Sequence, residues 1–247
     1  MTARLQNKTA LITGGAGGIG IGIAKCYLRE GARVILSDLQ ESDGERALVR
    51  DHDTASFVTL DVTDETAWQT TIGDIGDQFG QLDILVNCAG ILPEMKPLDE
   101  ITLPEWQRVM DINLTGNFLG MKHAIKAMKA AGGSIIDISS IAGMVASPLI
   151  SSYSASKGGT RMLTKAAAID ATTKGYNIRV NSVHPGVINT PMTSGPNDQV
   201  AQVSAAIPMK RVGQPQDIGE ICVYLGSDES NYVTGSEFTV DGGYTAV

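Results

Sequence analysis

Seven short apolar runs, rich in β-branched residues, alternate along the chain with longer stretches of helical periodicity. Runs that are apolar on both faces and separated by helices are typical of a parallel sheet covered on each side. The runs read TALIT (9–13), RVILSD (33–38), SFVTLDV (56–62), LDILVN (82–87), SIIDIS (134–139), IRVNSV (178–183) and EFTVDG (237–242). The helical stretches are 17–29, 64–79, 104–131, 152–174 and 215–227. Because no linker interrupts this succession, we expect a single α/β domain over 1–247, with a doubly wound, seven-stranded, mostly parallel sheet and helices on both faces.

Composition and charge exclude several classes of protein. Among the 247 residues, 43% are hydrophobic and 19% are charged, which is ordinary for a soluble globular chain. The net charge of −8 argues against a nucleic-acid partner and against an anionic membrane surface. No apolar run approaches the ~20 residues of a membrane span, and the first residues do not have the pattern of a signal peptide. We therefore expect a cytoplasmic protein without a membrane partner.

The cysteines and histidines give no sign of a metal site or a disulfide framework. The three cysteines lie far apart and form no CxxC pair: Cys26, Cys88 and Cys222. The three histidines show no metal-ligand spacing: His52, His123 and His184. We expect no bound metal.

A glycine-rich loop, LITGGAGGIG, follows the first run. It matches GxGxxG at Gly15, Gly17 and Gly20, and it matches TGxxxGxG at Thr13, Gly14, Gly18 and Gly20. In either spacing, glycines permit a tight turn and a close approach of the backbone to a pyrophosphate, and the following helix N-terminus offers N–H groups to the anion. The loop therefore predicts a dinucleotide site in a Rossmann fold.

The second run ends in Asp38, 18 positions after Gly20. A carboxylate near this offset accepts hydrogen bonds from the ribose hydroxyls and repels a 2′-phosphate. A site for that phosphate would need a nearby Arg or Lys, whereas positions 15–19 hold neither and Leu39 follows Asp38. Arg33 begins the strand, at the wrong end to serve. We predict NAD as the cofactor.

The stretch SSYSASKGG, residues 151–159, places Tyr153 and Lys157 one helical turn apart among small residues. An isolated pair of this kind is more often an ordinary helix start with a half-buried Tyr. A free Tyr has a pKa of about 10 and is a poor base at neutral pH, but a nearby ammonium group favours the phenolate. Lowering the pKa to about 7 corresponds to roughly 4 kcal/mol. In the context of the glycine loop, the pair predicts an acid–base couple for hydride-transfer chemistry.

These features together resemble the classical short-chain dehydrogenase/reductase family, over about residues 5–247. Further stretches match: TLDVTD, LVNCAG, DINLTG, DISSIAG and NSVHPGVINTP. The resemblance implies four catalytic residues: Asn113, Ser140, Tyr153 and Lys157. It implies cofactor contacts from Gly14, Gly18, Ile19, Gly20, Asp38, Leu39, Asp61, Val62, Asn87, Ala89, Gly90, Tyr153, Lys157, Pro185, Gly186, Val187, Ile188 and Thr190. In the family, the asparagine holds a water that links the lysine to solvent, and the serine donates to the substrate oxygen.

At two positions the match to the family pattern is incomplete or ambiguous. The family usually has two asparagines before the Ala-Gly pair, and here Cys88 replaces the second, so a hydrogen bond that braces the central sheet is expected to be missing. Ser139 and Ser140 are adjacent and pattern alone does not separate them, but Ser140 has the family's offset of 13 residues before the tyrosine.

The sequence also resembles bacterial secondary-alcohol and cyclic-alcohol dehydrogenases. This resemblance implies the NAD-dependent interconversion of a secondary alcohol and its ketone. We expect the substrate to meet Ser140 and Tyr153 between apolar walls formed by Ile91, Leu92, Val145, Val187, Met192 and Met209. The loop at about 190–210 is expected to act as a lid. The family further implies a homotetramer with contacts through helices 104–131 and 152–174.

Other functions remain open at this point. Within the reductases these are a 3-oxoacyl thioester reductase and a hydroxysteroid dehydrogenase. A non-catalytic NAD-sensing protein is a different class, although such a relative could lose catalytic residues that are all present here. An epimerase or dehydratase of the extended branch would carry a larger carboxyl-terminal substrate region.

Overall fold

The computed structural model describes residues 3–193 and 197–247. Its sheet has seven strands in the order β3-β2-β1-β4-β5-β6-β7, and every pair of neighbours is parallel. The strands are β1 (Thr9–Thr13), β2 (Arg33–Asp38), β3 (Ala55–Thr59), β4 (Ile84–Asn87), β5 (Gly133–Ile138), β6 (Ile178–Pro185) and β7 (Glu237–Val240). This order is that of a doubly wound α/β fold, so the predicted fold class is confirmed.

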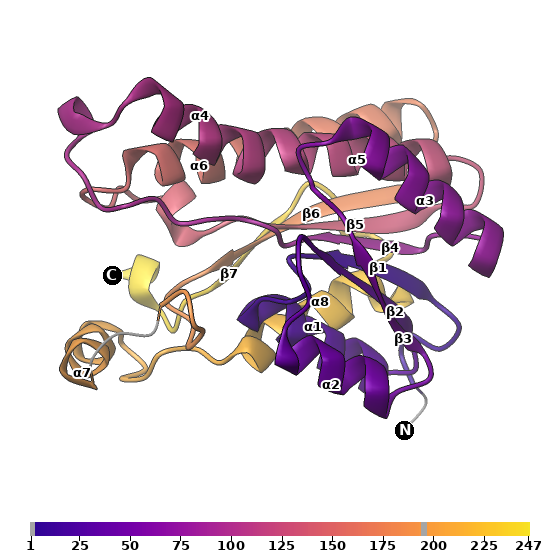
Figure 1. Cartoon of the computed structure of the whole chain (residues 1–247), viewed down its shortest axis with the longest axis horizontal. Coiled ribbons are helices and arrows are strands. Elements are labelled where there is room, and N and C mark those ends of the chain that lie inside the picture. The colour runs from indigo at the N-terminus through magenta and orange to yellow at the C-terminus, as the bar shows by residue number, and fades with distance from the viewer. Residues whose placement is uncertain (1–2, 194–196) are drawn as a thin grey trace.

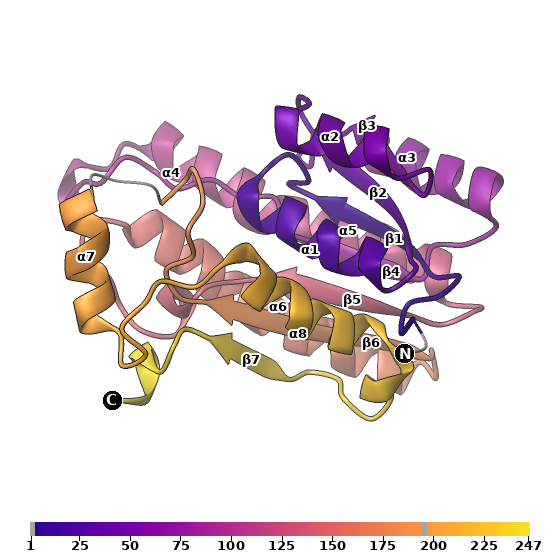
Figure 2. The same cartoon turned by 90° about the horizontal axis from the view of Figure 1, so that it is seen from below.

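Helices cover both faces of the sheet (Figure 1). They are α1 (Gly18–Arg29), α2 (Asp43–Asp51), α3 (Glu65–Phe79), α4 (Leu103–Met110), α5 (Gly116–Met128), α6 (Ser151–Thr173), α7 (Asn197–Ala206) and α8 (Pro215–Gly226). Helices α1, α2 and α8 lie on one face, and α3, α4, α5 and α6 lie on the other, as Figure 1 shows. Seen from below in Figure 2, α1 and α8 run side by side across the sheet.

The strands are apolar on both sides because each sheet face has its own core. Ile12 of β1 is fully buried in the core shared with α1 and α8, whereas its neighbour Leu11 is fully buried in the core shared with α3, α5 and α6. Successive side chains of a strand point to opposite faces, so one short apolar run supplies both cores. Each such side chain contributes roughly 1.5–3 kcal/mol by burial.

The predicted helix at 104–131 differs in the structure. It begins as α4, changes to a π-helical turn over Asp111–Thr115, and continues as α5. A π turn adds one residue to a helical turn and leaves the apolar periodicity on either side intact, so the sequence pattern did not reveal it. Helix α2 was not among the predicted segments, because it is short and begins in the acidic stretch where Ser42 caps the Glu45 N–H at 3.2 Å.

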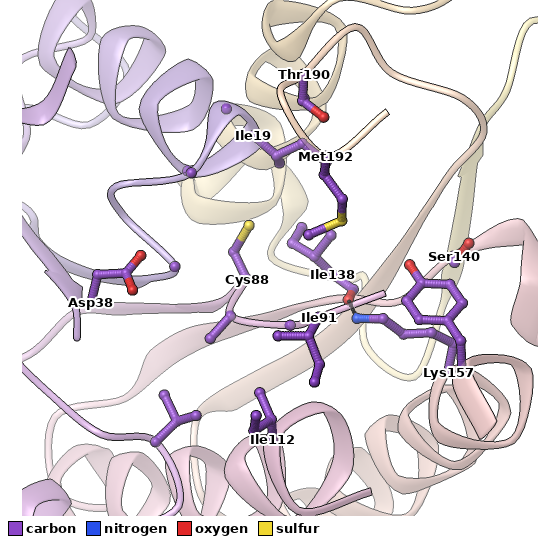
Figure 3. Close-up of a pocket in the computed structure, with 18 of the residues that line it drawn as sticks. Ile19, Asp38, Cys88, Ile91, Ile112, Ile138, Ser140, Lys157, Thr190 and Met192 are labelled. Atoms are coloured by element: carbon purple, nitrogen blue, oxygen red, sulfur yellow. Dashed lines mark hydrogen bonds between the residues drawn. The ribbon is translucent and has the colours of Figure 1, made fainter. Parts of the chain in front are cut away.

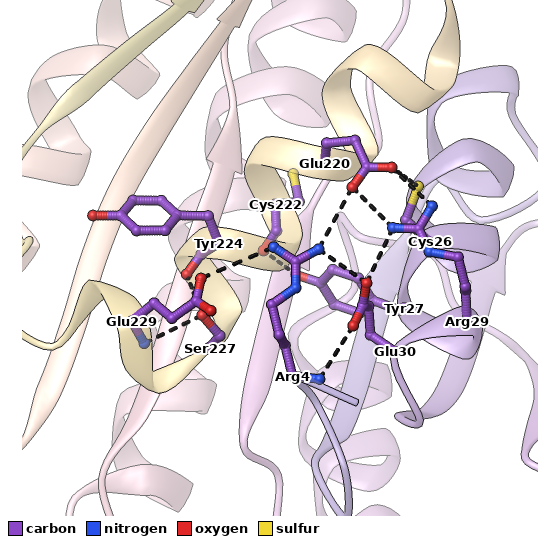
Figure 4. Close-up of polar contacts among 10 residues, drawn as sticks. All are labelled: Arg4, Cys26, Tyr27, Arg29, Glu30, Glu220, Cys222, Tyr224, Ser227 and Glu229. Atoms are coloured by element: carbon purple, nitrogen blue, oxygen red, sulfur yellow. Dashed lines mark hydrogen bonds and ion pairs between the residues drawn. The ribbon is translucent and has the colours of Figure 1, made fainter. Parts of the chain in front are cut away.

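Polar contacts fix α1 against α8 (Figure 4). The fully buried Tyr27 hydroxyl donates to the Cys222 carbonyl oxygen at 3.0 Å, and Arg29 Nη1 lies 2.8 Å from Glu220 Oε1. The Arg29 guanidinium beside Glu220 holds the pKa of that carboxyl below its usual range. These contacts fix the last turn of α1 on α8.

The chain reverses its direction across the sheet between β1 and β4, which are neighbours. A crevice opens outside the carboxyl ends of the strands at such a switch point, and ligands of doubly wound folds bind there. Within the described part of the chain, no helix combines the length and the apolar character that a bilayer crossing requires.

Candidate active site

A cavity of about 780 Å³ lies at the carboxyl ends of the strands, at the switch point. It extends from Asp38 at one end to Ser140 and Lys157 at the other (Figure 3), and Tyr153, which bonds Ser140, also lines it. This volume is within the range of ligand sites in proteins. Within residues 3–193 and 197–247, no group of three or more His, Cys, Asp or Glu side chains gathers in a way that could hold a metal ion.

The glycine loop forms the floor of the cavity between β1 and α1. Gly14 has a φ of +65°, and a Cβ there would lie 2.9 Å from the backbone nitrogen of Ala89, so only glycine fits. A Cβ on Gly20 would collide with the Gly14 carbonyl oxygen. The N-cap residue of α1 is Gly17, which has no side chain to satisfy the first N–H groups of the helix. The loop thus offers backbone donors to an anion at close range.

Asp38 ends β2 beside this loop. Its Oδ2 accepts a hydrogen bond from the Ala16 N–H at 3.2 Å, and its Oδ1 accepts one from the Leu39 N–H at 2.8 Å. These bonds orient the carboxylate toward the cavity, which it lines. The lining residues that the structure describes include two cations, Arg108 and Lys157.

The wall next to Asp38 comes from the residues that follow β3 and from the π turn. Asp61 Oδ1 accepts from the Thr63 N–H at 2.9 Å and from the Thr63 hydroxyl at 2.7 Å, and this fixes the turn after the strand. Val62 packs so closely on Gly116 that a Cβ there would lie 2.9 Å from Val62 Cγ2. Asp61, Val62 and Ile112 all line the cavity. The side of α4 that lines it was not predicted, because no motif marks it: Pro104, Gln107 and Arg108.

Asn87, at the end of β4, is a predicted cofactor contact, but the structure places its side chain elsewhere. Asn87 does not line the cavity: its side chain turns to the sheet, where Nδ2 donates to Asp137 Oδ1 at 2.8 Å. Asp137 is fully buried, and burial raises its pKa to about 7. Asn87 itself therefore braces β4 to β5. The Thr13 hydroxyl oxygen adds a second brace by accepting from the N–H groups of Cys88 and Ala89 at 3.0 and 3.1 Å.

Cys88 lies at the position of the missing second asparagine. Its side chain points into the cavity (Figure 3), and burial raises the pKa of its thiol to about 12, so the thiol stays protonated. The sheet is braced without a side-chain amide at this position. Ala89 and Gly90 line the cavity as predicted.

Asn113 lies inside the π turn and is fully buried. Its Oδ1 accepts from the Ile91 N–H at 2.8 Å, and its Nδ2 donates to the Ile91 carbonyl at 3.0 Å and to Ser156 Oγ at 3.2 Å. The asparagine thus joins the segment after β4 to the helix that carries Tyr153 and Lys157. A Cβ on Gly90 would lie 3.3 Å from Asn113 Oδ1 and 3.5 Å from Lys157 Nζ, so both groups surround this glycine.

Tyr153 and Lys157 lie on the first two turns of α6, as predicted. Burial raises the pKa of Tyr153, while a hydrogen bond with the Ser140 hydroxyl acts in the opposite direction. Lys157 is almost fully buried, and burial lowers its pKa to about 8. Its Nζ lies 5.7 Å from the centre of the Tyr153 ring and donates to the Ile138 carbonyl at 2.7 Å. The expected lowering of the tyrosine pKa by Lys157 is therefore not present in this structure.

The structure distinguishes the two adjacent serines. Ser139 is buried, and its hydroxyl donates to the Lys157 carbonyl at 2.9 Å, which anchors α6 to β5. Ser140 Oγ accepts from the Ala142 N–H at 3.1 Å and lies beside the phenol. The geometry thus favours Ser140 as the serine that faces a substrate.

Residues after β6 close the cavity on the side of α1. Thr190 packs on Gly18, where a Cβ would lie 2.8 Å from the Thr190 side chain. Met192 points into the cavity from above (Figure 3), and it is 55% exposed. The lining residues of this segment are Pro185, Gly186, Ile188, Thr190, Pro191, Met192 and Thr193.

Several predicted substrate-side residues are not brought into the cavity by this structure. Ile91 and Met192 line it, whereas four apolar residues do not and are exposed instead: Leu92, Val145, Val187 and Met209. In the predicted lid at 190–210, residues 194–196 lie outside the described residues, and α7 occupies Asn197–Ala206. Contact of the four exposed residues with a substrate, and of Val187 with the cofactor, stays a prediction.

Comparisons with known proteins identify the relatives of this chain. The family model described as "Enoyl-(Acyl carrier protein) reductase" matches residues 14–245. The chain is 42% identical to the NADP-dependent (R)-specific alcohol dehydrogenase of Lentilactobacillus kefiri, with 100% of each chain covered. It is 46% identical to trans-4-hydroxycyclohexanecarboxylate dehydrogenase of Sinomonas cyclohexanicum, over 98% of this chain and 95% of the relative. A crystal structure described as a "putative gluconate dehydrogenase" from Agrobacterium tumefaciens superposes with a TM-score of 0.93 at 33% identity, covering 100% of this chain and 99% of that one.

Proposed function

Because the chain belongs to the short-chain dehydrogenase/reductase family, we propose that it interconverts a secondary alcohol and its ketone, with NAD as cofactor. One observation carries this proposal. The Tyr153 phenol, the Ser140 hydroxyl and the buried Lys157 amine converge at one end of a cavity whose other end is formed by a glycine loop and a carboxylate. The phenol, hydroxyl and amine suit proton transfer at an alcohol oxygen. The glycine loop and the carboxylate suit the binding of a dinucleotide.

The residues present fit a nicotinamide dinucleotide. The loop is a cradle that Cβ atoms at Gly14 and Gly20 would fill, and the α1 N-terminus faces it. When bound, the cofactor supplies or accepts the hydride. We propose that it is held by Gly14, Gly18, Ile19, Gly20, Asp38, Leu39, Asp61, Val62, Ala89, Gly90, Pro185, Gly186, Ile188 and Thr190, together with Tyr153 and Lys157. Asn87 supports this set from behind the cavity wall, through Asp137.

The chain's own groups handle the proton and the oxygen. Tyr153 Oη takes the hydroxyl proton during alcohol oxidation and returns it during ketone reduction. The Ser140 hydroxyl donates to the substrate oxygen and stabilises the charge that develops there. Lys157 supplies a positive charge near the phenol while it is protonated, up to a pH near its pKa of about 8. Asn113 keeps the Ile91 segment and α6 in register, which fixes the distance between the cavity wall and Tyr153.

Asp38 is the basis for proposing NAD rather than NADP, although one relative is named as NADP-dependent. Replacing Asp38 by Asn removes the charge that repels a 2′-phosphate and keeps one side-chain oxygen, which can accept from the Ala16 or the Leu39 N–H group but not from both. We expect the preference for NAD, as the ratio of kcat/KM values, to fall by roughly 10- to 100-fold, because a hydrogen bond to a charged group contributes about 1.5–3 kcal/mol. Steady-state rates with each cofactor measure this ratio.

Asp43→Asn is the matched control, since its side chain is fully exposed at the start of α2 and the same charge is removed. This variant is expected to keep the wild-type ratio. A wild-type enzyme that already prefers NADP would show that the argument from Asp38 is wrong.

The surroundings of the reacting end favour a neutral, apolar substrate. Ile91, Ile138 and Met192 lie around it (Figure 3). Lys157 is bound to the Ile138 carbonyl, and Lys96, which follows the Ile91 segment, is paired with Glu94 and Glu105. Among the residues that the structure describes at this end, a buried substrate carboxylate would find no unpaired Lys or Arg, which is costly.

A matched pair of alcohols tests the substrate class. Cyclohexanol and trans-4-hydroxycyclohexanecarboxylate share the ring and the reacting carbinol and differ in the carboxylate. We expect kcat/KM for the neutral alcohol to be higher by at least about tenfold, because of the cost of burying an unpaired charge. A preference for the carboxylate would contradict the neutral class. In that case Arg108, the other cation of the wall, is the candidate partner, and Arg108→Met would abolish the preference.

We propose one NAD-binding domain over 1–247, a substrate lid at about 190–210, and a cytoplasmic homotetramer. The tetramer is supported by an exposed apolar groove between α5 and α6, which includes Phe118 and Met162 with exposed fractions of 45% and 60%. Sedimentation velocity measures the assembly, and a stable monomer would contradict it.

A further inference from the structure

His184 is a fully buried histidine at the end of β6, next to the end of β5, where Ser140 follows the strand. The strands are paired at Ile138 and Val183, so the two chain segments leave the sheet side by side. Its side chain is not part of the cavity wall that the described residues form. A buried imidazole has to bond its two ring nitrogens, and both partners are present.

The ring joins β6 to the Ser140 main chain. His184 Nδ1 lies 3.2 Å from the Ser140 carbonyl oxygen, and Nε2 lies 2.8 Å from the hydroxyl of the fully buried Ser182. A carbonyl oxygen only accepts, so Nδ1 carries the proton and donates. Burial lowers the pKa of His184, which keeps the ring neutral, and Nε2 then accepts from the Ser182 hydroxyl. The tautomer is therefore set by the two partners.

The remaining bonds of this segment show what the histidine adds. The Ser140 carbonyl also accepts from the Gly143 N–H at 3.0 Å, but that bond is local to the turn and moves with it. The preceding residue, Ser139, is tied to Val183 by its N–H at 2.8 Å and to Lys157 by its hydroxyl. His184 is the side chain that ties the Ser140 peptide itself to the sheet.

We propose that His184 is a positioning residue, which holds the Ser140 main chain so that the Ser140 hydroxyl points at the substrate oxygen beside Tyr153. The inference rests on the proposed function, because it assigns Ser140 a part in the reaction. A misplacement of about 1 Å by a residue outside the site costs as much as 10²-fold in rate. Loss of the His184 donor is thus expected to lower kcat by about 10- to 100-fold, with the Kd for NADH unchanged.

The test is a double-mutant cycle with Ser140. His184→Leu keeps the approximate volume and removes the donor, and His184→Asn keeps an N–H donor near the position of Nδ1. We expect His184→Leu to lower kcat by about 10- to 100-fold in the wild-type background and by less than about threefold in Ser140→Ala, since there is no hydroxyl left to orient. His184→Asn is expected to restore most of the lost kcat. Calorimetry with NADH measures cofactor binding for each variant.

His123→Leu is the matched control, because His123 of α5 is also buried and its Nε2 lies 3.0 Å from Oε1 of Glu65, at the start of α3. It is expected to keep the wild-type kcat. Where His184→Leu does not fold, Ser182→Ala removes the partner of Nε2 instead, and its loss of kcat is likewise expected only when Ser140 is present. Equal losses in both backgrounds, or no loss, would overturn the positioning role. Inactivity of the wild-type protein with every alcohol and ketone would instead contradict the proposed function.

Discussion

Replacing Tyr153 by Phe is expected to lower kcat by about 10²- to 10⁴-fold, the usual contribution of a general acid–base group. The substitution removes the phenol oxygen, which bonds the Ser140 hydroxyl, and keeps the ring that lines the cavity. NADH binding should change little, because the glycine loop and Asp38 at the other end are untouched. Single-turnover rates and calorimetry measure the two quantities separately.

Tyr27→Phe is the matched control for this variant. The Tyr27 hydroxyl donates to the Cys222 carbonyl between α1 and α8, so its loss removes the same atom from a site outside the cavity. The control is expected to lose some stability, on the order of 1 kcal/mol, and to keep its kcat. A Tyr153→Phe variant with more than half of the wild-type kcat would remove Tyr153 from the mechanism.

Replacing Lys157 by Met should lower kcat by orders of magnitude and also weaken NADH binding. The amine is buried between the Ile138 carbonyl and Gly90, at the junction of the two halves of the cavity. Its pKa is lowered to about 8, so below that pH it is charged. Burial dominates the pKa of Tyr153 in this structure, and we propose that the Lys157 charge acts on the phenol when the proton is transferred, where it favours the phenolate. The pH profile of alcohol oxidation should therefore move to the alkaline side.

Lys165→Met provides the control on the same helix, since Lys165 pairs with Glu237 at the surface. Its pH profile and NADH affinity should equal those of the wild type. If Lys157→Met leaves both the pH profile and the NADH affinity as they are in the wild type, the double role of Lys157 is wrong.

The sheet was predictable because its strands are buried on both sides. Leu11 and Ile12 pack into the cores on opposite faces of the sheet. Consecutive residues of such a strand therefore have to be apolar, and this pattern is visible in the sequence. The π turn was not predictable. Asn113 lies in this turn and bonds Ile91 and Ser156 from it. The spacing of apolar residues in α4 and α5 does not indicate that the helix changes between them.

The ends of the strands were predicted as a set, whereas the directions of their side chains were not. Asn87 and Cys88 are adjacent in an extended segment, so their side chains point to opposite faces. Asn87 bonds Asp137 in the sheet, whereas the side chain of Cys88 lines the cavity. A motif does not state which neighbour a side chain bonds. The direction of Lys157 likewise depends on the Ile138 carbonyl, which is brought near by folding. Leu92, Val145 and Met209 lie on loops, where sequence pattern says little about orientation.

The central claim is that this site transfers hydride between NAD and a secondary alcohol, with Tyr153 moving the proton. Its most direct test mixes the purified protein with NAD and cyclohexanol and follows the absorbance of the reduced cofactor, with Tyr153→Phe measured alongside. We predict that reduced cofactor accumulates with the wild type and at a rate lower by at least about 10²-fold with the variant. No accumulation from any secondary alcohol with NAD, in a protein that binds NADH, would contradict the claim, and so would equal rates for the two proteins.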